Sequence, residues 1–249
     1  MCRSFSTPGP ERHPIWPGEL RSCRRSDTAS VPTGTSSLQP HLEWNGLFQT
    51  QLLLLNPFPE SRVVTLRLRT ASGIQAAPDY RLTMPAFSTA SQTIEAIFSF
   101  PDASPGAGWL ELEGDRGAVL ATALVFDPRS GAAAASALLP EGGGKWSLPY
   151  FIENAQYYTG LAILNPGDAP VGIELSAYDP SGELISSLPL VLENRHGRTL
   201  LVSQWMPSLP AEATGQIVIQ AGGPVLPLAY FGTDDGVALA AVPLQLLPR

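Results

Sequence analysis

The apolar residues of this chain fall into short runs in which they alternate with polar positions, a pattern typical of β-strands. Residues 62–70 show it clearly, because Leu66 and Leu68 alternate with Arg67 and Arg69. Similar runs recur at intervals of about 8–12 residues with turn residues between them, which indicates an all-β sandwich. The other predicted strands are 47–55, 79–83, 108–113, 118–126 and 132–139, followed by 157–164, 172–178, 184–192, 215–220, 225–231 and 237–244.

One stretch of this pattern occurs twice. Phe48-Gln-Thr-Gln-Leu-Leu-Leu-Leu-Asn-Pro57 is followed 109 residues later by Tyr157-Tyr-Thr-Gly-Leu-Ala-Ile-Leu-Asn-Pro166, and Ser72-Gly73 is matched by Ser181-Gly182 at the same offset. The offset then shrinks slightly, as loop deletions would cause. Further matches pair Gly108–Leu112 with Gly215–Ile219, Phe126 with Phe231, and Gly131 with Gly236. A period near 100 residues is that of a whole small domain, so the sequence predicts two tandem antiparallel β-sandwiches that arose by internal duplication.

The domain boundaries follow from this repeat. We expect sandwich modules at 41–140 and 146–249, joined by a short linker at 141–145 that allows modest motion. Residues 1–40 show neither strand nor helix periodicity and are predicted to be a disordered tail. An alternative is that residues 28–38 add as an edge strand to a neighbour's sheet. Helix is expected only as a turn or two within 93–98 and 199–206, each of which ends before a proline.

Composition narrows the functional classes. The chain has 23 Gly and 25 Pro among 249 residues, which excludes long helices. Its net charge is −7 and it contains one Lys, so nucleic-acid binding is not expected. Cys2 and Cys23 both lie in the tail, which excludes a disulfide framework from the modules. No apolar run reaches the length of a transmembrane segment, and the first 30 residues lack the apolar core of a signal peptide.

The residues needed for catalysis are scarce. A hydrolytic triad needs a histidine base, and the candidates are His13 and His41 in or beside the tail and His196 in a polar loop. Asp234 and Asp235, with Asp127 at the matching place in the first module, fit a turn better than a calcium site. We therefore expect no enzyme activity, no catalytic residue, no cofactor and no metal site.

Aromatic residues gather where each module begins. They are Trp44, Phe48, Trp146, Tyr150, Phe151, Tyr157 and Tyr158. One interpretation is that Trp146, Phe151, Tyr157 and Tyr158 form an exposed contact surface for a sugar ring or a protein. The other is that these side chains close one end of each core or lie between the modules.

The repeated motif resembles a known kind of module. Tyr158-Thr-Gly-Leu-Ala-Ile-Leu-Asn-Pro166, the Ser-Gly turn that follows, Gly215–Ile219 and the Gly108-Trp109 pair are similar to a module found in tandem in large secreted or surface proteins of environmental bacteria. The resemblance covers residues 41–249. It implies an immunoglobulin-like sandwich outside the cell and brings no catalytic residues with it. The lack of a signal peptide in this chain departs from that pattern.

Together these observations predict a non-enzymatic spacer, adhesive or assembly module of an extracellular or cell-surface protein. Its expected partners are a protein or a glycan at the cell surface. The alternative is a carbohydrate-binding module that uses the aromatic cluster at the module entry. The sequence leaves the oligomeric state open.

Overall fold

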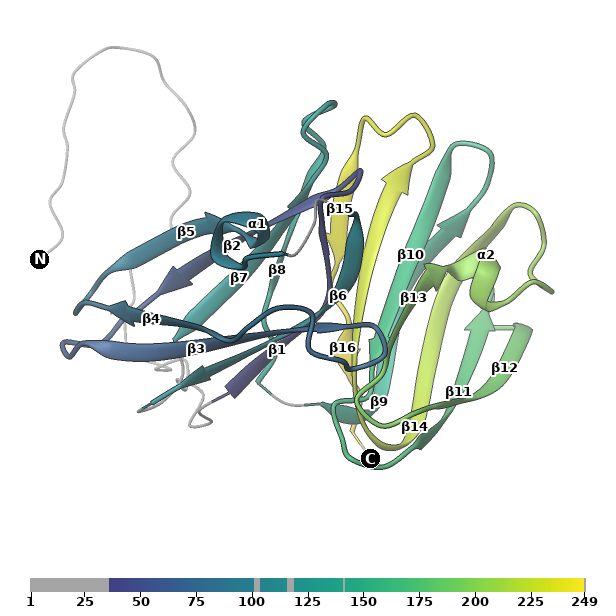
Figure 1. The fold of residues 1–249 in the computed structure, drawn as a ribbon. Helices are drawn as coiled ribbons and strands as arrows, with labels where there is room; N and C mark the ends of the chain where they lie inside the picture. The colour runs from purple at the N-terminus through teal and green to yellow at the C-terminus, as the bar shows by residue number, and fades with distance from the viewer. Residues whose placement is uncertain (1–35, 101–103, 116–118, 141, 249) are drawn as a thin grey trace, which may run out of the picture. The chain divides into compact units, whose positions relative to one another are not determined.

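The computed structural model describes residues 36–100, 104–115, 119–140 and 142–248, so most of the predicted tail lies outside the described residues. Pro32–Arg249 form one compact unit. The fold is all-β, as predicted, and its described helices are two single turns (Figure 1). Neither is long enough to cross a membrane.

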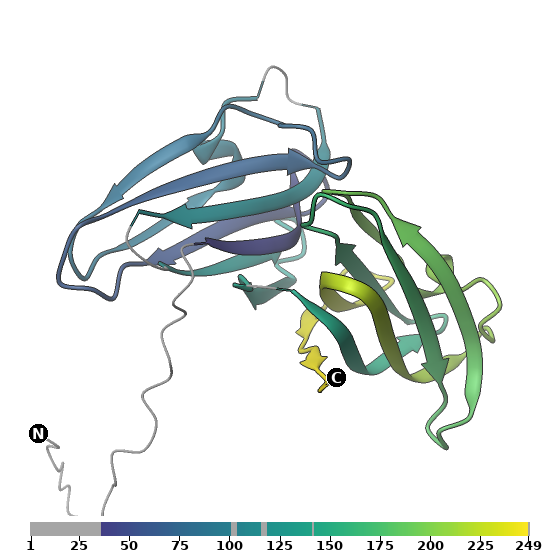
Figure 2. The same cartoon turned by 90° about the horizontal axis from the view of Figure 1, so that it is seen from below.

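The first sandwich, residues 36–140, consists of two antiparallel four-stranded sheets that enclose an apolar core (Figure 2). One sheet has the order β1 (Ser36–Trp44), β6 (Gly106–Gly114), β3 (Arg62–Thr70) and β4 (Tyr80–Met84). The other has the order β5 (Thr89–Thr93), β2 (Gln49–Leu55), β7 (Leu120–Phe126) and β8 (Ala133–Ala137). The helical turn α1 (Ile94–Ile97) follows β5 and buries Ile94 and Ile97 in this core.

The second sandwich, residues 142–248, is built around one long strand, β14 (Ala213–Thr233). Its first part pairs with β11 (Val171–Tyr178) and β9 (Gly143–Glu153), and its second part pairs with β10 (Tyr157–Leu164) and β15 (Leu239–Val242). The remaining elements are β12 (Leu184–Leu192) beside β11, β13 (Gly197–Leu201) beside β10, the helical turn α2 (Val202–Trp205), and β16 (Gln245–Leu246) beside β9.

Both sandwiches have the same strand order. The order β4-β3-β6-β1 in the first corresponds to β12-β11-β14-β9 in the second, and β5-β2-β7-β8 corresponds to β13-β10-β14-β15. The long β14 therefore takes the places of both β6 and β7. This explains why the separately predicted strands 215–220 and 225–231 form one element in the structure.

The expected tail and linker boundaries need correction. Ser36 to Pro40, assigned to the tail, lie in β1, where Ser36 pairs with Glu113 of β6 in the same chain rather than with a neighbour. Gly143 to Lys145, assigned to the linker, begin β9. Ladder hydrogen bonds are made by backbone groups, so these polar and glycine-rich segments pair even though their side chains give no strand signal.

Two buried asparagines end equivalent strands in the same way. Asn56 follows β2, and its Nδ2 lies 2.8–3.3 Å from the carbonyl oxygens of Glu60, Met84 and Pro85. Asn165 follows β10, and its Nδ2 lies 2.8–3.1 Å from the carbonyl oxygens of Ala169, Leu192 and Glu193. Each Oδ1 accepts a backbone N–H two residues further on. Both side chains are fully buried, so each one ties a strand end to the turn on the opposite sheet.

Replacing either asparagine removes these donors and leaves buried carbonyl groups without a partner. We expect Asn165→Ala and Asn56→Ala each to lower the free energy of unfolding by about 2–4 kcal/mol. Denaturant titration measures the change. Asn194→Ala, at an exposed loop position, is the matched control and should leave stability close to wild type. Equal stability of Asn165→Ala and Asn194→Ala would contradict this role.

Candidate functional site

The structure separates the four aromatic residues predicted to form a contact surface. Trp146 and Phe151 are buried in the core of the second sandwich, and the Trp146 indole donates to the carbonyl oxygen of Val225 at 3.0 Å. These two are core residues, because the β9 positions that carry them face inward. Tyr157 is partly exposed and stacks on Phe231 with ring centroids 5.3 Å apart. Tyr158 is partly buried and lines a cavity between the two sandwiches.

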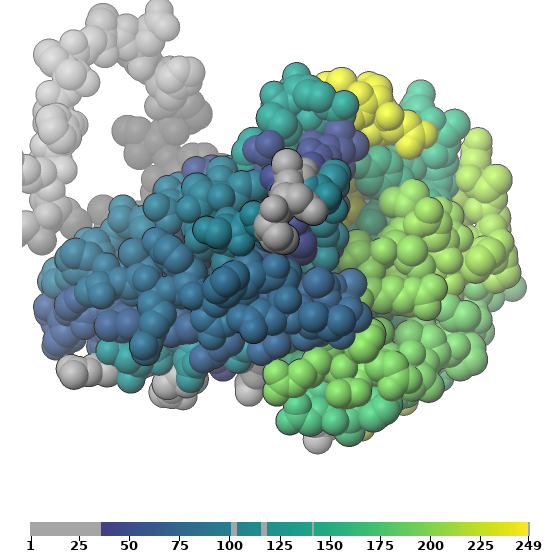
Figure 3. Space-filling model, viewed as in Figure 1, coloured from purple at the N-terminus to yellow at the C-terminus, as the bar shows by residue number. Residues whose placement is uncertain are grey.

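Two apolar clusters join the sandwiches. In one, Trp109 of β6 packs against Leu164 of β10 and Leu226 of β14. In the other, Val125 and Ala134 of the first sandwich meet residues of the second, which are Ala162, Leu228 and Tyr230. In Figure 3 the yellow atoms of the C-terminal part lie against teal atoms of the first sandwich, where β15 runs beside β8. The junction thus buries apolar surface from both halves.

A histidine forms one of the polar links across the junction. His41 of β1 is 8% exposed; its Nδ1 lies 3.1 Å from the Thr199 hydroxyl of β13, and its Nε2 lies 3.2 Å from Glu43 Oε1. In the neutral tautomer protonated on Nε2, the imidazole donates to Glu43 and accepts from Thr199, so both ring nitrogens are satisfied. No sequence pattern indicated this role, since His41 adjoins the expected tail.

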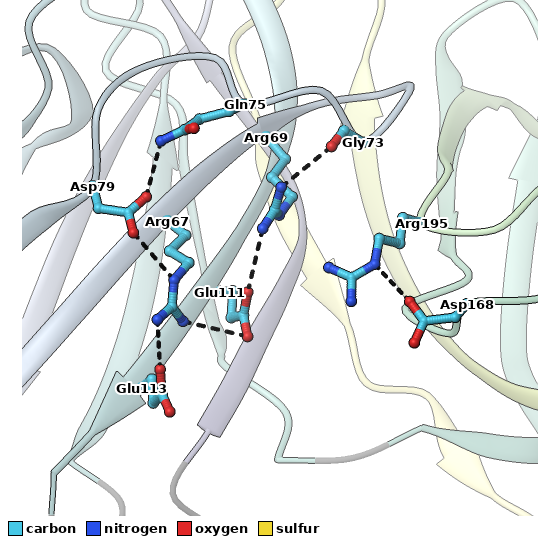
Figure 4. A network of polar contacts seen from close by, with 9 residues as sticks. All are labelled: Arg67, Arg69, Gly73, Gln75, Asp79, Glu111, Glu113, Asp168 and Arg195. Atoms are coloured by element: carbon cyan, nitrogen blue, oxygen red, sulfur yellow. Dashed lines mark hydrogen bonds and ion pairs between the residues drawn. The ribbon is translucent and has the colours of Figure 1, made fainter.

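The loop between β3 and β4 also reaches the second sandwich. The N–H of Gly197 donates to the carbonyl oxygen of Ala71 at 2.8 Å. Gly73, with a φ of +78°, approaches the backbone of Arg195 so closely that a Cβ atom there would collide with the Arg195 carbonyl group. Arg195 in turn donates to Asp168 at 2.8 Å (Figure 4). A glycine is required at this turn for both its backbone conformation and this close approach.

Ion pairs neutralise the arginines of the first sandwich near this loop. Arg67 lies 2.7 Å from Glu113, 3.3 Å from Asp79 and 3.6 Å from Glu111 (Figure 4). The hydrogen bond to Glu113 is the main reason that the pKa of Arg67 is raised. Because its guanidinium is already surrounded by carboxylates, Arg67 is not free to bind a phosphate or another anion.

The junction cavity has a volume of about 390 Å³ and draws its lining from both sandwiches. Its aromatic residues are Phe48, Tyr158 and Tyr230, and its carboxylates are Glu43 and Asp234. Burial raises the pKa of Tyr230 to about 12, and burial together with Asp234 and Glu43 raises the pKa of Tyr158. Both phenols therefore stay protonated at neutral pH, and the Tyr230 hydroxyl is hydrogen-bonded to Ser136 at 3.2 Å.

Other chemistry finds little support in the part of the chain that the structure describes. There, no three His, Cys, Asp or Glu side chains gather to hold a metal ion. Thr199, His41 and Glu43 have the connectivity of a hydroxyl–imidazole–carboxylate triad. However, the Thr199 hydroxyl belongs to an exposed strand residue, and its hydrogen bond to His41 joins the two sandwiches.

The sequence matches no family model and no curated protein. Among solved structures, it is similar to an Anabaena sensory rhodopsin transducer at 20% identity, covering 35% of this chain and 95% of that one with a TM-score of 0.32. It is also similar to Thermotoga maritima 1070 at 16% identity, covering 43% and 96% with a TM-score of 0.36. A Bacteroides uniformis beta-glucuronidase shows 11% identity over 81% of this chain and 25% of its own, with a TM-score of 0.17.

Trp109 tests whether the apolar junction stabilises the protein. Trp109→Ala removes a side chain that is 2% exposed, and we expect the free energy of unfolding to fall by about 3–5 kcal/mol. Trp109→Phe keeps an aromatic ring and removes an indole N–H that has no hydrogen-bond partner among the described residues, so its cost should stay below about 1.5 kcal/mol. Denaturant titration compares the two variants. An equally small loss in both would show that Trp109 packing contributes little.

Proposed function

We propose that this chain is a non-enzymatic pair of immunoglobulin-like β-sandwiches, produced by internal duplication, that serves as a rigid spacer, adhesive or assembly element. Its place would be in an extracellular or cell-surface protein, with a protein or a glycan as its partner. The observation that carries the proposal is the docked pair of sandwiches with equivalent topology. The resemblance to tandem modules of secreted bacterial proteins supports the location.

Three features shared by the halves favour duplication. Their strand orders correspond, and the buried Asn56 and Asn165 make equivalent hydrogen bonds. Gly108 and Gly215 also occupy matching positions, where a Cβ atom would collide with the carbonyl oxygen of Arg69 in one case and of Tyr178 in the other. Two unrelated halves would have to acquire the same close glycine contact and the same asparagine hydrogen bonds independently, so a duplication explains the shared features better.

Rigid docking is supported by a difference in exposure between equivalent strands: the outward face of β10 is buried, whereas the outward face of β2 is partly exposed. On β10, Ala162 and Leu164 face away from their own core, yet they are 2% and 0% exposed because the first sandwich covers them. At the equivalent positions of β2, Leu53 and Leu55 are 42% and 37% exposed. Nearby, Gln51 takes the place of Gly160, which suits a face that meets water. A largely apolar junction restricts the motion expected of a short linker.

The carbohydrate-binding alternative has less support. It relied on an exposed cluster of four aromatic residues, and two of them, Trp146 and Phe151, are buried in the core. Tyr157 and Tyr158 remain accessible but face different surroundings, one against Phe231 and the other in the junction cavity. A glycan array tests this alternative directly, and binding that Tyr158→Ala abolishes would favour it over the spacer.

Gly73 and Gly182 offer a matched test of the rigid junction. Both have positive φ, so alanine at either position costs about 1–2 kcal/mol in backbone strain. Only Gly73 meets the other sandwich, because a Cβ atom at Gly182 would have nothing within 4 Å. We expect Gly73→Ala to loosen the pair, which small-angle X-ray scattering would detect as a larger radius of gyration.

Gly182→Ala should lower stability similarly while leaving the scattering profile unchanged. Circular dichroism on both variants confirms that the sheets are retained. If wild-type protein already scatters as two freely moving bodies, or if the two variants scatter alike, the proposed rigid spacer is wrong.

A further inference from the structure

We infer that the junction cavity binds a small organic cation, such as a quaternary ammonium group, within its aromatic and acidic lining. This inference goes beyond the proposed structural role and depends only on the docked arrangement that creates the cavity. Its volume of about 390 Å³ is in the range of sites for small molecules.

Charge is the first reason. Glu43 and Asp234 contribute carboxylates to the cavity, and the described residues that line it include no Lys or Arg. The protonated phenols of Tyr158 and Tyr230 add no charge. His41, which also lines the cavity, directs its Nε2 at Glu43 and its Nδ1 at Thr199. The cavity therefore carries two carboxylates and, among its described lining residues, no Lys or Arg, which favours a cation and disfavours an anion.

Aromatic surface is the second reason. Phe48, Tyr158 and Tyr230 line the same cavity from both sandwiches, and aromatic faces attract a cation that has lost part of its hydration shell. The fold leaves room for the Tyr158 ring because residue 232 is a glycine. The ring lies over Gly232, where any Cβ atom would collide with the phenol. The repeat carries Gln49 where the second sandwich has Tyr158, so this aromatic position is specific to the junction side.

The remaining polar groups explain why a cation fits better than a sugar. The side chain of Gln204 accepts the Leu201 N–H, and Tyr230 is hydrogen-bonded to Ser136. Within the described part of the chain, the Tyr158 hydroxyl and the Asp234 carboxylate make no side-chain hydrogen bond, and both are available to a ligand. The rest of the lining is mainly aliphatic: Val125, Ala162, Leu200, Leu201 and Leu239. A sugar needs many directed polar partners, whereas an alkylammonium ion needs apolar walls and a nearby carboxylate.

Choline and its uncharged carbon isostere, 3,3-dimethylbutan-1-ol, separate charge from shape. We expect choline chloride, titrated into the full chain at constant ionic strength, to shift amide resonances around the cavity in a saturable way. The uncharged alcohol should bind at least about tenfold more weakly, which corresponds to the loss of about 1.4 kcal/mol of cation–π and carboxylate attraction. Heteronuclear NMR or calorimetry gives both dissociation constants.

Neighbouring aspartates provide the matched variants. Asp234→Asn removes one charge at the cavity and should therefore weaken choline binding about tenfold. The local fold should be retained, because the backbone N–H of residue 234 still donates to Gln156. Asp235→Asn removes the same charge one residue away, outside the cavity lining, and keeps the oxygen that accepts the Val237 N–H. Its dissociation constant for choline should remain that of wild type.

Three results would overturn the inference: no saturable choline binding by wild-type protein, equal binding of the uncharged alcohol, or equal weakening by both aspartate variants. A sugar that binds where choline does not would also overturn it and favour the carbohydrate alternative. Scattering measured on the same samples keeps the two proposals apart. If the wild-type pair scatters as a compact body but does not bind choline, only the ligand site is wrong. If the wild-type pair scatters as two loosely connected bodies, the rigid spacer is wrong.

Discussion

The burial of one sheet face of the second sandwich against the first is the interaction on which the other features depend. It places Leu164 and Leu226 against Trp109, and it brings His41 to Thr199 across the junction. Burial of apolar surface is non-directional, so it supplies attraction without fixing an arrangement. Directional contacts fix the arrangement that the apolar contact makes favourable. They include the hydrogen bonds of His41 with Thr199, of Ser136 with Tyr230, and from the Gly197 N–H to Ala71.

The sequence predicted the parts of the fold that depend on local alternation. The strands at 62–70 and 184–192 coincide with β3 and β12, because their side chains alternate between the two faces of a sheet. The apolar run at 157–164 coincides with β10, which is buried on both faces at its end. Strand β5, Thr-Ala-Ser-Gln-Thr, was not predicted because it is a mostly exposed edge strand without an apolar face. Strand β9 was missed because glycines and Pro149 within it read as loop residues. Its long pairing with β14 outweighs that local signal.

The candidate site was harder to predict for a different reason. Its residues come from β1, β7 and Phe48 of the first sandwich and from β10, β13, α2, β14, β15 and Asp234 of the second. They meet only when two complete sandwiches dock. Trp109 lies in a strand whose side chains point alternately to its two faces. The residues next to it in the sequence do not indicate that its side chain packs against the other sandwich. Tyr158, Trp146 and Phe151 were predicted to share one contact surface, but Tyr158 lines the junction cavity whereas Trp146 and Phe151 lie in the core of the second sandwich. Aromatic residues that lie close together in the sequence therefore do not lie on one surface of the folded protein.

The long strand β14 has a mechanical consequence for the second sandwich. In the first sandwich, β6 and β7 are separate elements, so its two sheets are connected through loops. In the second, a single strand passes from one sheet into the other: its pairing with β11 ends at Ala221, its pairing with β10 begins at Leu226, and Gly222 and Gly223 lie between the two ladders. Opening either sheet strips partners from this shared strand and weakens the other. The second sandwich should therefore lose its structure as a single cooperative unit, with the paired amides of β14 on both sides of Gly222 and Gly223 exchanging with solvent only when the whole sandwich opens.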